Sequence, residues 1–344
     1  MDINYLKETL KKLLSIHSPL GYYEEIIPFM EQELEKIGYE SRKINRGGLL
    51  VTFGEGRHVA VSCHLDEIGL SVRKIKDDGK MTLCPIGGIY AKTLNESEGE
   101  VVTLDGKKYS ATVRHEYPSV HISERDEYSV VLDLYKNMEL ILDELVYSKE
   151  DVEKLGINPG DFVLLDPRTK FLDNGFIKSR FIDDKAGVAC VLMLTALKEI
   201  KEKKLKINKK ITIHFSVYEE NGTGGASGIP YDIEEMLAVD IGCVAKDSTA
   251  EETKVSIISQ DSRSPYSRTM IQKLKKLADK NSIDYTIDVN YPHYGSDTSP
   301  AIASGHDIQF GLIGPGTFAS HGFERTHIKA LENTYKLLLA YLTE

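Results

Sequence analysis

The spacing of apolar residues predicts that the chain begins with two helices. Apolar side chains recur every three or four residues over 6–14 and again over 26–37, and Gly38 stands where a glycine commonly ends a helix. Short apolar runs of the β type follow at 49–53, 58–63 and 68–72. We therefore expect two helices that lead into the first strands of a sheet.

Residues 74–167 show a different pattern, in which many short stretches alternate apolar and polar positions. Asp-Gly pairs at 78–79 and 105–106 are the residues that tight hairpin turns favour. This part of the chain is predicted to form a small all-β domain.

From Phe181 onward, helical patterns alternate with strand patterns. The runs, in chain order, cover 184–200, 211–218, 267–280, 307–314 and 333–342. Such alternation is typical of a mostly parallel sheet with helices on both faces. The predicted fold is therefore one α/β domain made of residues 1–73 and 168–344, into which the β-rich segment 74–167 is inserted.

Composition narrows the possible partners. The net charge of −10 argues against nucleic acid, and the one basic stretch, 198–210, is interpreted as a solvated helix end and loop. No run approaches the ~18 apolar residues of a membrane span, and the N-terminal segment lacks the apolar core of a signal peptide. Four cysteines without metal-binding spacing are typical of buried free thiols in a reducing compartment. We expect a soluble, cytoplasmic protein.

Acidic and histidine side chains follow several predicted strands. His64 and Asp66 come directly after the run at 58–63, and ligands bind at the carboxyl edge of open α/β sheets. Residues two apart on an extended segment share a face, so Asp66 could orient His64 or help to bind a metal beside it. Taken alone, the pair is also compatible with an ordinary strand end.

Two pairs of adjacent carboxylates come later in the chain. Asp183 and Asp184 precede an apolar helix, where either could be a ligand or the N-cap of that helix. Glu219 and Glu220 follow a predicted strand, and neighbouring carboxylates repel one another unless a cation or a proton lies between them. A charged strand end would also explain this second pair. The glycine-rich loop after it lacks the Gly-Lys step of a phosphate-binding loop.

A mixed set of imidazoles and carboxylates emerges when these segments are combined with an acid that closes another apolar run and a histidine near the C-terminus. Its members are His64, Asp183, Glu220, Asp240 and His321. These ligand types suit Zn, Co or Mn, and the lack of Cys ligands argues against a closed structural zinc site. Two ions ~3.5–4 Å apart could share a hydroxide and polarise a carbonyl, with a carboxylate next to one ligand as general base.

These motifs resemble those of the tetrahedral or glutamyl aminopeptidases of metallopeptidase family forty-two, also called deblocking aminopeptidases or cellulase M. The matching segments are SCHLDEIGL (62–70), RFIDDKAG (180–187), YEENGTGGA (218–226), VDIG (239–242) and HYGSDTSPA (293–301), together with a C-terminal histidine. The likeness spans nearly the whole chain. The long separation between His64 and Asp183 matches the family whose β-rich insert lies at that point.

The resemblance implies a zinc-exopeptidase-like fold that carries a β-barrel-like insert and binds two divalent ions, Zn or otherwise Co or Mn. Asp183 would bridge the ions, and the remaining ligands would be His64, Glu220, Asp240 and His321. The catalytic residues would be Glu219, as general base, and Asp66, which would fix the imidazole of His64.

The resemblance also implies a substrate and an assembly. The protein would remove N-terminal residues from short peptides. It would assemble through dimers into a tetrahedral dodecamer, in which the insert would make contacts between subunits. The residues after His321 depart from the usual family pattern, which leaves His327 as a rival ligand. The loop at 221–226 departs as well, so the preferred N-terminal residue is not implied.

Two other functions are compatible with parts of the pattern. One is a metal-dependent peptide-binding assembly protein without turnover. The other is glycoside hydrolysis by paired carboxylates, which requires two acids on either side of one substrate bond. Glu219 and Glu220 are adjacent and would diverge from a strand, which disfavours the glycosidase.

Overall fold

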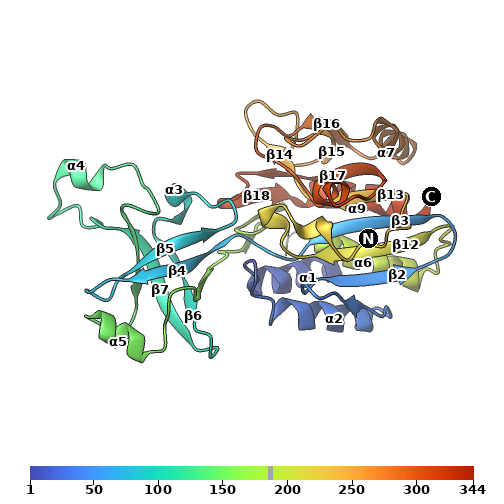
Figure 1. Ribbon diagram of the computed structural model, residues 1–344. Coiled ribbons are helices and arrows are strands. Elements are labelled where there is room, and N and C mark those ends of the chain that lie inside the picture. The colour runs from blue at the N-terminus through green and yellow to red at the C-terminus, as the bar shows by residue number, and fades with distance from the viewer. Residues whose placement is uncertain (185–188) are drawn as a thin grey trace. The chain divides into compact units, whose positions relative to one another are not determined.

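The computed structural model describes residues 1–184 and 189–344, which form two compact units (Figure 1). The larger unit combines Met1–Glu67 with Arg168–Glu344, and the smaller unit is Ile68–Pro167. The predicted boundary after residue 73 lies inside strand β4 (Gly69–Ile75), the first strand of the smaller unit.

The larger unit is built on a sheet that has twelve strands within the described residues. Four strands form its parallel centre, in the order β12 (Lys210–Ser216), β3 (His58–His64), β13 (Glu235–Val239) and β17 (Gln309–Phe318). The flanking strands are β1 (Arg42–Lys43), β2 (Leu49–Phe53), β10 (Lys170–Phe171), β11 (Phe176–Ser179), β14 (Gly242–Val244), β15 (Val255–Gln260), β16 (Tyr285–Val289) and β18 (Glu324–His327). The predicted α/β class is confirmed.

Helices cover both faces of this sheet, and its central strands are therefore buried on both sides. In β3, Val59, Val61 and Cys63 belong to the largest apolar core, whereas Ala60 belongs to a second core on the other face. The helices that contribute to the largest core are α1 (Ile3–Ser15), α2 (Ile26–Lys36), α6 (Ala189–Glu202), α7 (Arg268–Lys280) and α9 (Ile328–Thr343). Helix α8 (Thr298–Ala303) contributes to the second core.

The smaller unit is a closed barrel. Its strands follow the order β4, β5 (Met81–Ile86), β8 (Met138–Leu142), β7 (Lys108–His115), β6 (Ser97–Val102) and β9 (Phe162–Leu165), and its short helices are α3 (Ala91–Leu94), α4 (Arg125–Tyr128) and α5 (Lys149–Lys154). Both Asp-Gly pairs form hairpin turns, in which Gly79 and Gly106 have φ of 81° and 79°.

The prediction assigned one strand to the wrong sheet. The run at 68–72 was expected to continue the first sheet, but it forms β4, which pairs with β5 and β9 in the barrel. An apolar run predicts a strand without specifying its partner, because pairing depends on residues far away in the chain.

The prediction that Asp183 or Asp184 caps the following helix lies outside the described residues, as does the end of the RFIDDKAG motif. Helix α6 is described from Ala189. Among the described helices, none has the length and apolar character needed to cross a membrane.

Candidate metal centre

The predicted site residues gather at the carboxyl ends of the parallel strands. His64 is the last residue of β3 and pairs with Ser216, the last residue of β12, so the two strands end level with one another. Asp240 directly follows β13, and a short 3-10 turn, η1 (Glu219–Asn221), begins just after β12. This alignment explains how residues from distant segments reach one place.

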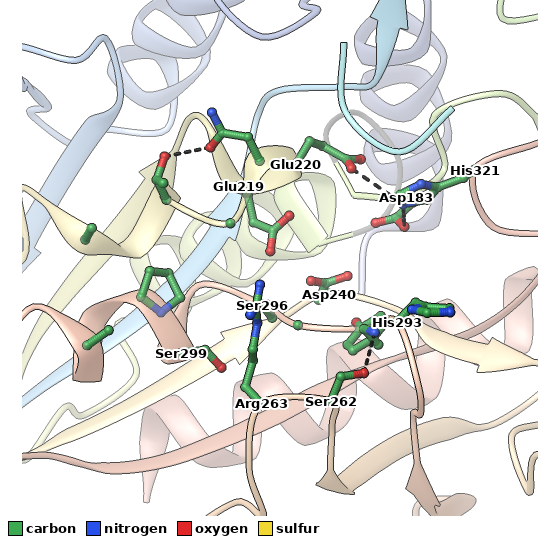
Figure 2. Close-up of a pocket in the computed structure, with 18 of the residues that line it drawn as sticks. Asp183, Glu219, Glu220, Asp240, Ser262, Arg263, His293, Ser296, Ser299 and His321 are labelled. Carbon is green, nitrogen blue, oxygen red and sulfur yellow. Dashed lines mark hydrogen bonds and ion pairs between the residues drawn. The ribbon is translucent and has the colours of Figure 1, made fainter. Parts of the chain in front are cut away.

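Two clusters of possible metal ligands share Asp183. One contains His64, Asp183 and Asp240, and the other contains Asp183, Glu220 and His321; in each, the potential donor atoms lie within 4.8 Å of one another. Asp183 Oδ1 is 3.6 Å from His64 Nε2, and Asp183 Oδ2 is 3.5 Å from His321 Nε2. Figure 2 shows Asp183, Glu220 and His321 turned toward one another, with Asp240 facing the same space. One carboxylate thus stands between two groups of donors.

Burial shifts the protonation of these groups. Burial, reinforced by the charge of Asp183, raises the pKa of Glu220 to about 8 and the pKa of Asp240 to about 7. Burial acts in the same direction on Asp183, but His321 and His64 hold the pKa of that carboxyl below its usual range. Carboxylates crowded in this way are stabilised by protons or by cations, and the His and carboxylate donors fit Zn, Co or Mn.

Glu219 lies beside the clusters and is a member of neither. Its Oε2 is 3.9 Å from His64 Nε2, and its side chain is turned into the same cavity (Figure 2). Burial raises the pKa of Glu219 well above its usual value, with further contributions from Asp240 and Asp297. A carboxylate in this environment can accept a proton and return it.

Asp66 contacts both His64 and the turn that carries the two glutamates. Its carboxylate accepts hydrogen bonds from the backbone N–H groups of Glu219 (3.1 Å) and Glu220 (3.2 Å). Nδ1 of His64 lies 2.9 Å from the backbone carbonyl oxygen of Asp66 and 3.7 Å from its carboxylate. The peptide group of Asp66 therefore contacts the imidazole, whereas its side chain anchors the turn that carries both glutamates.

His327, the rival to His321, is engaged elsewhere. Its Nε2 is 3.0 Å from the carbonyl oxygen of Asn174, and its Nδ1 accepts a hydrogen bond from the backbone N–H of Lys329 at the start of α9. Within residues 1–184 and 189–344, His327 belongs to neither cluster. The geometry favours His321.

Two supporting residues had no clear signal in the sequence. Arg46 donates hydrogen bonds to the carbonyl and the hydroxyl of Thr223 and lies over the ring of Tyr218, so it holds both ends of the turn with the two glutamates. Glu324 accepts backbone hydrogen bonds from Asp183 and His321. Isolated polar residues resemble exposed positions in a sequence, and only the tertiary structure shows their contacts.

The clusters open into a cavity of about 950 Å³. Its acidic side is formed by Asp183, Glu219, Glu220 and Asp240. Among the described residues that line it, Arg263 is the one Lys or Arg, and Figure 2 shows this side chain extending into the cavity. A ligand with an ammonium group at one end and a carboxylate farther along would match this distribution of charge.

Comparisons with known proteins agree with one another. The family model described as M42 glutamyl aminopeptidase matches residues 47–337. YhfE of Bacillus subtilis (strain 168), named as a candidate aminopeptidase, is 41% identical over 97% of this chain and 96% of its own length. The solved TET1 peptidase of Pyrococcus horikoshii is 26% identical with a TM-score of 0.85, covering 98% of this chain and 99% of that one. Aminopeptidase APDkam598 of Desulfurococcus kamchatkensis is 25% identical with a TM-score of 0.86, covering 99% and 95%.

Proposed function

This chain belongs to the M42 glutamyl aminopeptidase family, a family of metal-dependent hydrolases of peptide bonds, and from that premise we propose that it is a two-ion aminopeptidase acting on short peptides. The observation that carries the proposal is the pair of donor clusters that share Asp183, with Glu219 beside them in one cavity. The proposed metals are Zn or, as alternatives, Co or Mn.

The proposed ligands follow from the two clusters. His64 and Asp240 would hold one ion, Glu220 and His321 the other, and Asp183 would contact both. When bound, two divalent ions polarise a carbonyl group and lower the pKa of water. Because the carboxylates are buried beside one another, binding of cations would also relieve their mutual repulsion.

Glu219 is the proposed general base. It takes a proton from the attacking water and passes that proton to the nitrogen of the leaving amine, so the carboxylate is regenerated in each turnover. Asp66 holds the backbone of Glu219, and Arg46 holds the end of the same turn, so the carboxylate is presented from a fixed position. Because the carboxylate needs little reorganisation to reach the reacting groups, the activation free energy is lower.

The cavity suits the N-terminus of a peptide. The acidic side would attract a free α-ammonium group, and Arg263 could contact a carboxylate of the same peptide. Short peptides carry both groups close together. The preferred N-terminal side chain depends on the shape of the loops and is left to experiment.

We also propose that the chain assembles with copies of itself, through dimers into a dodecamer. The TET1 peptidase of P. horikoshii, which is similar over the whole chain, is described as assembling into a tetrahedron or a large octahedral shell. The barrel unit exposes large apolar side chains, among them Leu104 (91%) and Ile122 (88%), as an interface between subunits would require. Sedimentation velocity tests this proposal, and a monomer at every concentration would contradict it.

The test of the function is hydrolysis of aminoacyl-anilides and short peptides by protein stripped of metal, before and after addition of Zn, Co or Mn. Activity should return with metal and release residues only from free N-termini, so N-acetylated peptides should be resistant. Peptides with a C-terminal amide, compared with free acids, would measure the contribution of a substrate carboxylate. Tight peptide binding without turnover in metal-loaded protein would favour the binding-protein alternative, which, like the glycosidase, gains no support from the comparisons.

A further inference from the structure

Glu324, the first residue of β18, connects two segments of the metal centre that are far apart in the sequence. Its side chain is 1% exposed. Oε2 accepts a hydrogen bond from the backbone N–H of Asp183 at 3.0 Å, and Oε1 accepts one from the backbone N–H of His321 at 2.9 Å. One carboxylate thus joins the residue common to both donor clusters to a second member of the Asp183, Glu220 and His321 cluster.

We propose that Glu324 is a positioning residue that sets the distance between Asp183 and His321 and thereby the affinity of the ion bound between them. This inference rests on the two-ion function proposed above. Glu324 belongs to neither donor cluster within the described residues, so it acts through the backbone of the two proposed ligands. A carboxyl group offers two oxygens, each of which can accept a backbone N–H, and this suits the task.

The two segments need such a connection because their backbones adopt unfavourable conformations. Phe181, Ala319 and His321 have φ of 64°, 60° and 60°, in the left-handed region that residues other than glycine rarely occupy. The side chain of His321 is also 30% exposed, far more than the 2% of His64. Burial alone therefore restrains His321 less than the other imidazole.

Glu324 is itself held firmly by the strands around it. Glu324 pairs with Ser179 in the antiparallel ladder between β18 and β11, and Ser179 lies four residues before Asp183. The next residue, Arg325, forms a two-armed ion pair with Glu252, at 2.7 and 2.8 Å. A carboxylate on this rigid support can impose its geometry on the two loops.

The test compares binding of Co²⁺ to metal-free wild type, Glu324→Gln and a matched control, Glu235→Gln, by calorimetry and by visible absorption of the bound ion. Glutamine keeps one acceptor oxygen but turns an NH₂ group toward a backbone N–H donor, so one of the two contacts is lost. Wild type should bind two equivalents. In Glu324→Gln one of the two equivalents should bind about 10–100-fold more weakly than in wild type, with an altered absorption spectrum.

Glu235 is a suitable control because it is also a buried carboxylate, 3% exposed, with hydrogen bonds to Tyr341 and Lys273 at the opposite end of β13. Glu235→Gln should lower the unfolding temperature without changing either Co²⁺ affinity. A purely structural role for Glu324 would give the same result in Glu324→Gln, and that result would overturn the inference.

If Glu324→Gln does not fold, Glu324→Asp replaces it in the same titration, since the shorter side chain can reach only one of the two N–H groups. Unchanged affinities in that variant would equally overturn the inference. Wild type that binds fewer than two ions would contradict the two-ion function and this inference together. Wild type that binds two ions, with variants indistinguishable from it, would contradict the inference alone.

Discussion

Among single residues, two adjacent glutamates approach different histidines because their side chains point in different directions. The backbone N–H groups of Glu219 and Glu220 both donate to Asp66, so the two residues start from one anchored turn. Glu220 Oε2 lies 3.5 Å from His321 Nε2, whereas Glu219 Oε2 lies 3.9 Å from His64 Nε2. In the described residues, only Glu220 completes a cluster of donors. We therefore propose separate roles for these two identical side chains.

The different positions of Glu219 and Glu220 predict different effects of substituting each one by glutamine. Glu219→Gln should retain both ions while kcat falls by about 10²–10⁴-fold, since the proton acceptor is lost but no ligand is. Glu220→Gln should bind the second ion less tightly, and added metal should restore part of its activity. Metal content by elemental analysis and steady-state kinetics on one peptide check both variants. Full activity in Glu219→Gln would remove Glu219 from the mechanism.

Among elements, the short turn that follows these glutamates is packed against the beginning of α8. A second short turn, η2 (Gly224–Ala226), follows η1, and a side chain at Gly225 would place its Cβ 1.9 Å from the carbonyl oxygen of Asp297, the N-cap residue of α8. Asp297 also accepts hydrogen bonds from Ser62 on β3 and Ser216 on β12. The contact between η2 and α8 thus determines how far the turn lies from the strand ends.

Gly225→Ala is therefore expected to shift the turn. Because the obstructing atom is backbone, the loop has to move, at a cost of about 1–3 kcal/mol in the free energy of unfolding. A displacement of this kind near the reacting groups should lower kcat by about 10²-fold. Denaturant unfolding and kinetics measure the two effects.

The control for this variant is Gly311→Ala in β17, where a new Cβ would meet mainly the flexible side chain of Met270, at 3.2 Å. It should lose less stability and keep normal kcat. Folded Gly225→Ala with unchanged kcat would show that the packing of η2 on α8 does not position the glutamates.

The elements also show which parts of the site a sequence can predict. His64 and Asp240 stand directly after apolar runs, and such runs form the buried parallel strands of this fold, so the position of these residues at one sheet edge could be expected. The pairing of Glu219 with Glu220 was a further signal, because adjacent carboxylates are costly without a cation. Each of these predictions relied on local patterns.

Contacts across long separations could not be predicted in this way. Glu324 lies three residues after His321, and nothing in the local sequence indicates that its ladder partner is Ser179. The run at 68–72 has the composition of a strand in either sheet, and its membership of the barrel follows from pairing with β5 and β9. The carboxylate of Asp66, which was expected to fix the imidazole of His64, also accepts hydrogen bonds from backbone groups of another strand's turn, and that second contact had no signal in the sequence. Register and backbone hydrogen bonds are properties of the folded chain.

For the whole molecule, the crowded carboxylates connect metal binding to stability and to pH. In the metal-free protein, burial raises the pKa of Glu220 to about 8, that of Asp240 to about 7 and that of Glu324 to about 8, from 4.5, 3.8 and 4.5. Between about pH 4 and pH 8 the folded state then binds more protons than the unfolded state. Glu199, whose pKa is about 2, and Lys209, whose pKa burial lowers to about 8, act outside this window. Burial also lowers the pKa of His214 and His306 from 6.5, so these two imidazoles oppose the trend in the acidic part of the window.

The free energy of unfolding of the metal-free protein should therefore fall as pH rises from about 4 to 8. Over this range carboxyl groups ionise more easily in the unfolded chain than in the buried site of the folded protein. Divalent ions bind the deprotonated groups, so the stabilisation by excess Zn should grow over the same range, reaching about 2.7 kcal/mol when free Zn is 100 times its Kd. Urea unfolding in chelator and in excess Zn, at several pH values, measures both trends. Asp240→Asn removes one of the titrating groups and should flatten the slope of the metal-free protein. Metal-free stability that rises with pH would mean that these carboxyls ionise freely in the folded state, and the repulsion on which the two-ion site depends would then be absent.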